Sequence, residues 1–168
     1  IEGLRKHGVN EIVMLSGDNQ EVVDHVSRKL GLDRAYGSLL PDEKYRHVEQ
    51  ALNPSKTVGF IGDGVNDAPV ITLADIGIAM GGIGSDATVE TADVVIQTDQ
   101  PSKIPLAIEI ANFTHRIVWQ NIGFALGIKV LVMVLATLGM ATMWEAIFAD
   151  VGVALIAIGN AIRIQNKY

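Results

Sequence analysis

Two aspartates four residues apart, Asp63 and Asp67, follow a glycine-rich apolar run and could hold a cation. The apolar run at 57–61 predicts a buried strand, and residues 66–74 can form a helix with Asn66 or Asp67 as its cap. Both carboxylates then lie at the carboxyl end of a strand, where open α/β sheets bind ligands. Such oxygens suit a hard cation, for example Mg²⁺ carrying phosphate. A strand-to-helix turn with a capping aspartate is the simpler interpretation.

Two more polar positions could act on phosphate. The run Ser16-Gly17-Asp18 follows a predicted strand at 11–15, and by itself it is an ordinary turn. Lys44 lies in the first turn of a predicted helix, where a lone lysine is usually solvated. A seryl hydroxyl can donate a hydrogen bond to a phosphoryl oxygen. An ammonium group can offset the negative charge that develops during phosphoryl transfer.

Short apolar runs alternate with helical patterns over the first part of the chain. The predicted strands are at 11–15, 35–38, 57–61, 76–80 and 93–96. The predicted helices are at 1–7, 20–30, 41–53 and 66–74, with a short one near 85–91. This alternation predicts a parallel sheet covered by helices. We expect the sheet to be incomplete, because no residue before Ile1 supplies a first strand.

The charge pattern changes along the chain. Residues 1–110 carry 9 basic and 17 acidic groups, whereas residues 111–168 carry 4 basic and 2 acidic groups. In the charge-poor part, the segments 118–138 and 144–163 are apolar and about as long as the ~20 residues needed to cross hydrocarbon. Two buried helices of a soluble protein are the alternative. The basic residues that flank the segments favour two transmembrane helices, with both ends of the chain in the cytosol.

Each apolar segment contains one charged side chain, Lys129 in the first and Asp150 in the second. Both lie about 13 residues, or ~20 Å, from a flanking arginine, so antiparallel helices would bring them to the same depth. A charge inside hydrocarbon costs roughly 2.5–3.5 kcal/mol and therefore needs a partner or a role. One interpretation is a structural ion pair. The other is a metal path, in which Asp150 supplies hard oxygen and Lys129 a counter-charge.

Composition excludes several classes of site. Cysteine is absent, so neither a disulfide nor a thiolate metal site can form within these 168 residues. No basic patch with interleaved aromatic residues indicates nucleic-acid binding. No N-terminal signal peptide is visible, and the chain begins at Ile1 rather than at methionine. We therefore expect it to be the C-terminal part of something longer, or a processed chain.

The residues around the two aspartates carry a family resemblance. The run Gly62-Asp63-Gly64-Val65-Asn66-Asp67-Ala68-Pro69, with Ala74-Asp75-Ile76-Gly77-Ile78-Ala79-Met80-Gly81 after it, resembles the hinge motif of P-type ATPases. The catalytic domain of that family is haloacid-dehalogenase-like. The resemblance extends over all 168 residues, and it implies an α/β fold: a partial haloacid-dehalogenase-like (Rossmann-like) parallel sheet followed by two transmembrane helices.

The resemblance also implies roles for the polar residues. Ser16-Gly17-Asp18 is similar to the family's Thr-Gly-Asp motif, with serine in place of threonine. In the family, the lysine that corresponds to Lys44 lies against the phosphorylated carboxylate. The hinge residues have related roles: Asp63 would ligate Mg²⁺, and Asp67, with Asn66, would orient it and hold the loop.

The charged pair of the apolar segments narrows the resemblance to one class. The pair of Lys129 and Asp150 resembles what the last two helices of zinc-, cadmium- and lead-exporting P-type ATPases carry. The copper exporters carry Tyr-Asn and Met/Ser pairs in those helices, and this sequence has no such pair. The expected organisation is the C-terminal part of a phosphorylation domain at 1–105 and the last two transmembrane helices at 106–168, in the plasma membrane.

Several parts of such an ATPase are not among these residues. The family's nucleophilic aspartate, in an Asp-Lys-Thr-Gly-Thr motif, and a Cys-Pro-Cys type motif would both lie upstream. ATP would be bound mainly by an upstream domain. We therefore expect this chain alone not to turn over ATP, and we expect its partners to be Zn²⁺, Cd²⁺ or Pb²⁺, the lipid bilayer and the rest of the same polypeptide.

Two other functions remain open. A membrane-anchored haloacid-dehalogenase-like phosphatase would need its own Asp-x-Asp nucleophile on an early strand, and none occurs before Ser16. A non-catalytic membrane-bound module would leave Ser16, Lys44, Asp63 and Asp67 without a role.

Overall fold

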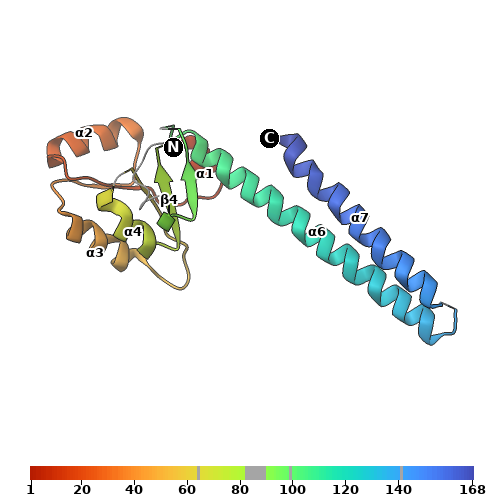
Figure 1. Cartoon of the computed structure of the whole chain (residues 1–168). Coiled ribbons are helices and arrows are strands. Elements are labelled where there is room, and N and C mark those ends of the chain that lie inside the picture. Colours follow the sequence, from red (N-terminus) through yellow and green to blue (C-terminus); the bar gives the residue numbers. More distant parts are fainter. Residues whose placement is uncertain (64, 82–89, 99, 141) are drawn as a thin grey trace. The chain divides into compact units, whose positions relative to one another are not determined.

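The computed structural model describes residues 1–63, 65–81, 90–98, 100–140 and 142–168. The chain divides into two compact units, Ile1–Pro105 and Leu106–Tyr168. The first unit contains all the strands that the structure describes, together with short helices, and the second contains only helix beyond its connecting turn (Figure 1).

The first unit is built from parallel strands and short helices. The helices that the structure describes in it are α1 (Glu2–Lys6), α2 (Gln20–Leu30), α3 (Pro41–Ala51), the 3₁₀ turn η1 (Val65–Asp67) and α4 (Ala68–Leu73). The short helix expected near 85–91 falls mostly outside the described residues. Its strands are β1 (Val13–Leu15), β2 (Arg34–Tyr36), β3 (Gly59–Gly62), β4 (Ile76–Met80) and β5 (Val94–Ile96). Strand β1 pairs in parallel with β2, and β3, β4 and β5 form a second parallel sheet in that order. The predicted parallel α/β fold is confirmed.

Local sequence signals account for the ends of α2 and α3. The Asn19 side chain accepts a hydrogen bond from the Glu21 backbone N–H at 2.9 Å, which caps α2. Gly31 ends the same helix in the left-handed conformation, with φ of 68°. In α3, Pro41 occupies the first turn and the Glu43 carboxylate accepts the Leu40 backbone N–H at 2.8 Å.

Two aspartates fasten neighbouring strands to one another. The Asp75 carboxylate, just before β4, accepts the Val58 backbone N–H at 2.8 Å, next to β3. The Asp93 carboxylate, just before β5, accepts the Gly77 backbone N–H in β4, also at 2.8 Å. The apolar core lies mainly under these three strands; the buried apolar residues of the first unit are Val23, Val48, Val70, Ile71, Ile78, Ala79, Met80, Ile96 and Ile104.

Helix α1 is held to the β1–β2 pair through Asp33. The Asp33 carboxylate accepts the Ile12 backbone N–H at 2.7 Å and pairs with the Arg5 guanidinium at 3.1 Å. The hydrogen bond from Ile12 and, next, the one from Arg5 lower the pKa of this carboxyl below its ordinary value, because both stabilise the charged form. Asp33 is therefore the electrostatic anchor of the N-terminal helix.

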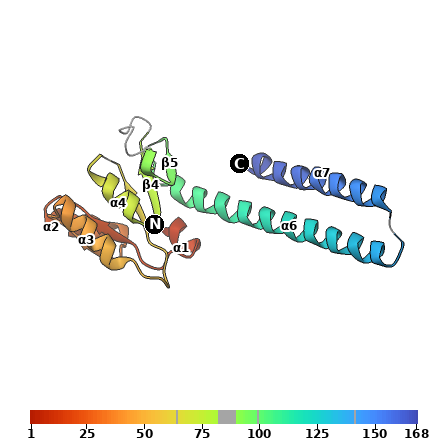
Figure 2. The same cartoon turned by 60° about the horizontal axis from the view of Figure 1, so that its bottom comes forward.

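The second unit is a helical hairpin. Helix α6 (Lys103–Thr137) runs into this unit without a break, and α7 (Met143–Lys167) follows after a short turn. From residue 106 onward the two helices run side by side in opposite directions (Figures 1 and 2). Both are long and apolar enough to cross a membrane, by length and composition, and their most apolar windows are 6% and 0% buried within the structure.

Candidate functional site

Lys44 and Asp67 form the best-buried ion pair that the described residues contain. The Lys44 Nζ donates to Asp67 Oδ1 at 3.0 Å, and only 20% and 12% of the two side chains are exposed. Lys44 comes from the first turn of α3, and Asp67 from the η1 turn that leads into α4. The pair places an ammonium group near the carboxyl end of β3, where the sequence predicted phosphate chemistry.

The side chain of Asp67 does not cap a helix in the structure. It occupies the N-cap position of α4, yet its side chain makes no cap hydrogen bond and instead accepts from Lys44. The simpler interpretation of this aspartate, as a capping residue only, is therefore wrong. Gly62 lets the turn close: a Cβ at that position would lie 2.7 Å from Asp67 Cβ and 3.2 Å from Ile71 Cδ1.

Asp63 precedes the η1 turn and Asn66 lies within it, and both residues are exposed. Among the described residues, no three His, Cys, Asp or Glu side chains lie close enough together to hold a metal ion. Two carboxylates nevertheless fit Mg²⁺, which commonly takes one or two protein carboxylates and completes its shell with water and phosphate oxygens. One oxygen of Asp67 pairs with Lys44, so its other oxygen and the exposed Asp63 carboxylate are the ones that would hold such an ion.

The Ser16-Gly17-Asp18 loop is held in place by backbone contacts on both sides. The Ser16 N–H donates to Tyr36 O at 2.9 Å, and Ser16 O accepts from Leu39 N at 3.0 Å. The Ser16 hydroxyl donates to Asp18 Oδ2 at 3.0 Å and accepts the Asp18 backbone N–H at 3.2 Å. The hydroxyl is therefore fixed at the carboxyl end of β1. Among the described residues, no hydrogen bond or ion pair joins this loop to the Lys44–Asp67 pair.

Lys129 and Asp150 face each other across the helical hairpin. Lys129 Nζ lies 3.7 Å from Asp150 Oδ1, and the side chains are 74% and 72% exposed. They line a hollow of about 640 Å³ whose other lining residues are all apolar: Ala125, Ile128, Val132, Met133, Ala136, Met143, Ala146, Ile147, Ala149, Val151 and Val153. The two charges that the sequence placed at one depth therefore meet.

An amide network between the same helices was not predicted from the sequence. Asn121 Nδ2 donates to Ala157 O at 3.2 Å, and Asn160 Nδ2 donates to Asn121 Oδ1 at 2.9 Å. Arg163 Nη1 in turn donates to Asn160 Oδ1 at 2.9 Å. Asn121 and Asn160 lie within the two apolar segments, and an amide at such a position is itself a signal of an interhelical hydrogen bond.

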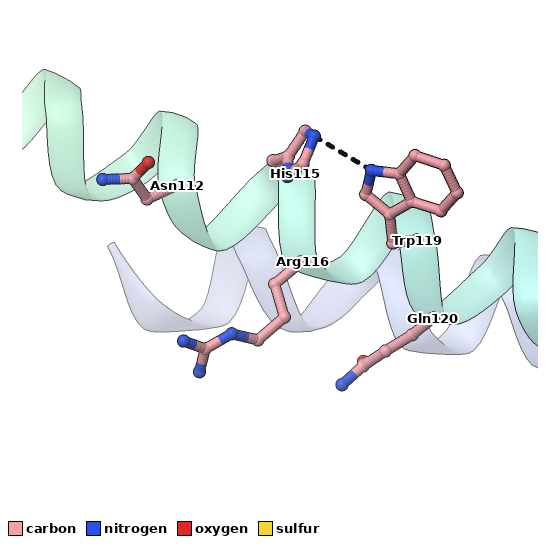
Figure 3. A pocket seen from close by; sticks show the side chains of 5 residues that line it. All are labelled: Asn112, His115, Arg116, Trp119 and Gln120. Carbon is pink, nitrogen blue, oxygen red and sulfur yellow. Dashed lines mark hydrogen bonds between the residues drawn. The ribbon is translucent and has the colours of Figure 1, made fainter.

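A polar hollow on α6 was also not predicted. Its volume is about 710 Å³, and it is lined by Asn112, His115, Arg116, Trp119 and Gln120. Trp119 Nε1 donates to His115 Nε2 at 2.9 Å, one helical turn away (Figure 3). All five residues belong to one helix, and most of the Trp119 side chain is exposed, so this is a polar surface rather than an enclosed site.

Comparison with known proteins agrees with this geometry. A family model described as haloacid dehalogenase-like hydrolase matches residues 1–75. A zinc-transporting ATPase of Synechocystis sp. is 57% identical over 168 residues, which cover 99% of this chain and 23% of that protein. A cadmium, zinc and cobalt-transporting ATPase of Bacillus subtilis is 52% identical over 169 residues, covering 99% of this chain and 24% of that protein.

A solved structure agrees as well. The crystal structure of a zinc-transporting PIB-type ATPase in the E2P state matches with a TM-score of 0.85 at 37% identity, over 97% of this chain and 26% of that one. The fold is therefore a haloacid-dehalogenase-like parallel sheet followed by two long apolar helices. The resemblance to metal-transporting P-type ATPases of the zinc and cadmium class is confirmed over the whole chain, which spans about a quarter of the length of these relatives.

Proposed function

We propose that this chain is part of an ATP-driven exporter of Zn²⁺, Cd²⁺ or Pb²⁺ that works through an aspartyl-phosphate intermediate. The nucleophilic aspartate and most of the ATP-binding surface lie in the rest of the same polypeptide. Residues 1–105 form the C-terminal part of the phosphorylation domain, and residues 106–168 supply two transmembrane helices. The near-complete match of this chain to about a quarter of two metal-transporting relatives supports the proposal.

The first unit supplies groups that stabilise a phosphoryl group. Lys44 offers a positive charge that its contact with Asp67 holds in one position, so it needs no reorganisation when negative charge develops. The Ser16 hydroxyl can exchange its hydrogen bond with Asp18 for one to a phosphoryl oxygen. Asp63 and Asp67 would hold Mg²⁺, which neutralises phosphate charge when it is bound.

The rest of the polypeptide also completes the sheet. Strands β1 and β3 each stand at the end of their own sheet and have a partner on one side only within the described residues. Val13 in β1 and Ile61 in β3 are each 42% exposed, whereas parallel sheets normally bury both faces. We infer that a strand from the upstream part of the ATPase pairs with these edges and brings the nucleophile to them.

The second unit crosses the plasma membrane, which in a bacterium is the inner membrane. Large apolar side chains point outward from both helices, among them Leu126, Met133, Phe148 and Leu155, each about 60–70% exposed. Hydrocarbon solvates such side chains and water does not. Arg116, Arg163 and Lys167 lie toward the ends away from the turn, so the positive-inside bias puts both ends of the chain in the cytosol.

The observation that carries the proposal is the ion pair between Lys129 and Asp150. A membrane anchor needs no charge inside its helices, and each such charge costs free energy in hydrocarbon. An ion pathway needs anionic oxygen there, and Asp150 supplies it, with Lys129 at 3.7 Å as the counter-charge when no metal is bound.

Transport by the full-length protein in reconstituted vesicles tests the proposal. We expect ATP-driven Zn²⁺ accumulation that Asp150→Ala abolishes while the variant still inserts. Lys129→Ala should reduce transport less than Asp150→Ala does. It can also leave ATP hydrolysis running without metal, because the lysine charge that stands in for the ion is gone. Restored Zn²⁺-dependent turnover in the double alanine variant would mean that the pair is only structural. Hydrolysis of small phosphate esters without transport would instead indicate a membrane-anchored phosphatase.

A further inference from the structure

Two asparagines connect α6 and α7 on the side of the ion pair that lies away from the turn. Asn160 Nδ2 donates to Asn121 Oδ1 at 2.9 Å and to Gln120 Oε1 at 3.3 Å, and Asn121 Nδ2 donates to Ala157 O at 3.2 Å. Asn121 and Asn160 are half-buried, whereas the residues next to them in sequence are exposed. Each asparagine therefore binds the opposite helix directly.

Arg163 fixes the orientation of this pair. Its guanidinium donates to Asn160 Oδ1 at 2.9 Å, so the oxygen of that amide is occupied. The NH₂ group of Asn160 is then the end that faces α6, where it meets two acceptors. An amide held at both ends has one favourable orientation, which makes the contact specific to one alignment of the helices.

The network and the ion pair lie on the same helix faces. Asn121, Ala125 and Lys129 follow one another at four-residue intervals along α6, and the last two line the hollow beside Asp150. On α7, Asp150, Val153, Ala157 and Asn160 follow at intervals of three, four and three residues. The network thus lies about 12–15 Å from the ion pair along the helix axes. Any sliding or rotation at one place is transmitted to the other, since both helices are continuous between them.

The contact resists sliding because its alternatives are poor. In hydrocarbon, apolar side chains slide past one another at little cost, since the lipid is as apolar as they are. A shift of α6 by one residue, about 1.5 Å, would separate the amide groups and leave them without partners where no water replaces them. The amides therefore select one register out of many that the apolar residues would accept.

We propose that Asn121 and Asn160 are positioning residues, which fix the axial register of α6 against α7 and so set the separation of Lys129 and Asp150. This inference rests on the proposed function, in which that pair forms part of the path of the transported metal. The separation matters because the lysine must be near enough to neutralise Asp150 when the site holds no metal, and the metal must displace it. A change in register alters this competition, and with it the affinity for the ion.

The test uses the full-length transporter in reconstituted vesicles with Zn²⁺ as the probe. Asn121→Ala and Asn160→Ala should each change the Zn²⁺ concentration for half-maximal ATP hydrolysis by about threefold to tenfold, the range that one lost interhelical hydrogen bond corresponds to. Maximal turnover should stay close to that of the wild type. The double alanine variant should show less than the sum of the two single effects, because the two residues share one hydrogen bond. Asn112→Ala is the matched control, since Asn112 is an exposed asparagine on the same helix.

Lys129 distinguishes positioning from general damage. Zn²⁺ affinity of the purified transporter, measured by equilibrium binding, should not change when Asn160→Ala is added to Lys129→Ala, because the lysine that the network positions is already gone. An equal effect of Asn160→Ala in both backgrounds would overturn the proposal, as would an unchanged Zn²⁺ dependence in both single variants. The proposed function fails on a different result, namely metal-stimulated turnover that survives Asp150→Ala.

Discussion

The Lys44 ammonium group lies 3.0 Å from the Asp67 carboxylate, although 23 residues separate the two in the sequence. The contact joins α3, which follows the β1–β2 pair, to the turn after β3, which belongs to the other sheet. It therefore links the two halves of the first unit at the point where phosphate chemistry is proposed. Lys44 has a structural partner and a proposed chemical role, and the two can be separated by experiment.

Replacing Lys44 with alanine should reduce phosphoenzyme formation from ATP at least tenfold in the full-length protein, because a fixed charge near the phosphoryl group is lost. It should also destabilise the fold by about 1–3 kcal/mol, since a largely buried carboxylate loses its partner. The acid-stable phosphoenzyme and the thermal unfolding midpoint measure the two effects.

A second variant separates the two roles of Lys44. In Lys44→Ala/Asp67→Asn the unpaired carboxylate is gone, so much of the stability should return while the phosphoenzyme stays low. Lys56→Ala is the control, because Lys56 is exposed and its side chain has no hydrogen bond or ion pair among the described residues. Wild-type phosphoenzyme in Lys44→Ala would exclude the lysine from phosphoryl transfer.

Asp63→Asn should abolish the phosphoenzyme with little change in stability. The side chain is exposed and makes no hydrogen bond to another described residue, so replacing its carboxylate costs the fold little. Mg²⁺, however, loses an anionic ligand, and an amide oxygen is a weaker one. Phosphoenzyme formation over a range of Mg²⁺ concentrations is the measurement; unchanged Mg²⁺ dependence would remove Asp63 from the metal site.

The sequence predicted the alternation of strands and helices well, because short apolar runs and helix caps are local features. Asn19 and Gly31, for example, cap α2 as their residue types indicate. The boundaries were less accurate. The helix expected at 66–74 begins as the 3₁₀ turn Val65–Asp67 and continues as Ala68–Leu73, because Asp67 turns its side chain to Lys44 instead of capping.

A long-range contact was predicted from the sequence only where both partners are charged residues in apolar segments. Lys129 and Asp150 stood out as ions in apolar segments, and helical geometry placed them at one depth. Asn121 and Asn160 carry no charge, so their pairing depended on the relative rotation of the helices, which composition does not give. The roles assigned to Ser16, Gly17, Asp18, Lys44, Asp63, Asn66 and Asp67 remain predictions, as do those of Lys129 and Asp150.

The pH dependence of stability should report the anchoring of α1 by Asp33. Its folded pKa is lowered, first by the Ile12 N–H and then by Arg5, so its contribution is complete above the unfolded pKa of about 4. The contribution is lost as the pH falls through the lower folded value. Asp33→Asn should therefore lower the unfolding midpoint of the chain at pH 7, and the difference from wild type should vanish in strong acid.

Glu49→Gln serves as the control for Asp33→Asn, since Glu49 is exposed on α3 and its side chain makes no hydrogen bond or ion pair among the described residues. It should unfold like the wild type at every pH. A difference between Asp33→Asn and wild type that persists unchanged in acid would mean that the carboxylate charge is not what holds α1.

Gly62→Ala should disturb the site through a single added carbon. The new Cβ would lie 2.7 Å from Asp67 Cβ and 3.2 Å from Ile71 Cδ1, closer than carbon atoms pack. Asp67 is fixed by its own 3₁₀ turn, so relief requires that the turn move and that its carboxylate leave Lys44. We expect a loss of about 1–3 kcal/mol in stability, typical of an overpacked position, and a weaker phosphoenzyme.

Gly59→Ala, in the same strand, meets nothing nearer than Ile76 O at 3.8 Å and should be tolerated. If both alanines had the same effect on unfolding and on the phosphoenzyme, the close approach at Gly62 would have no role in positioning Asp67.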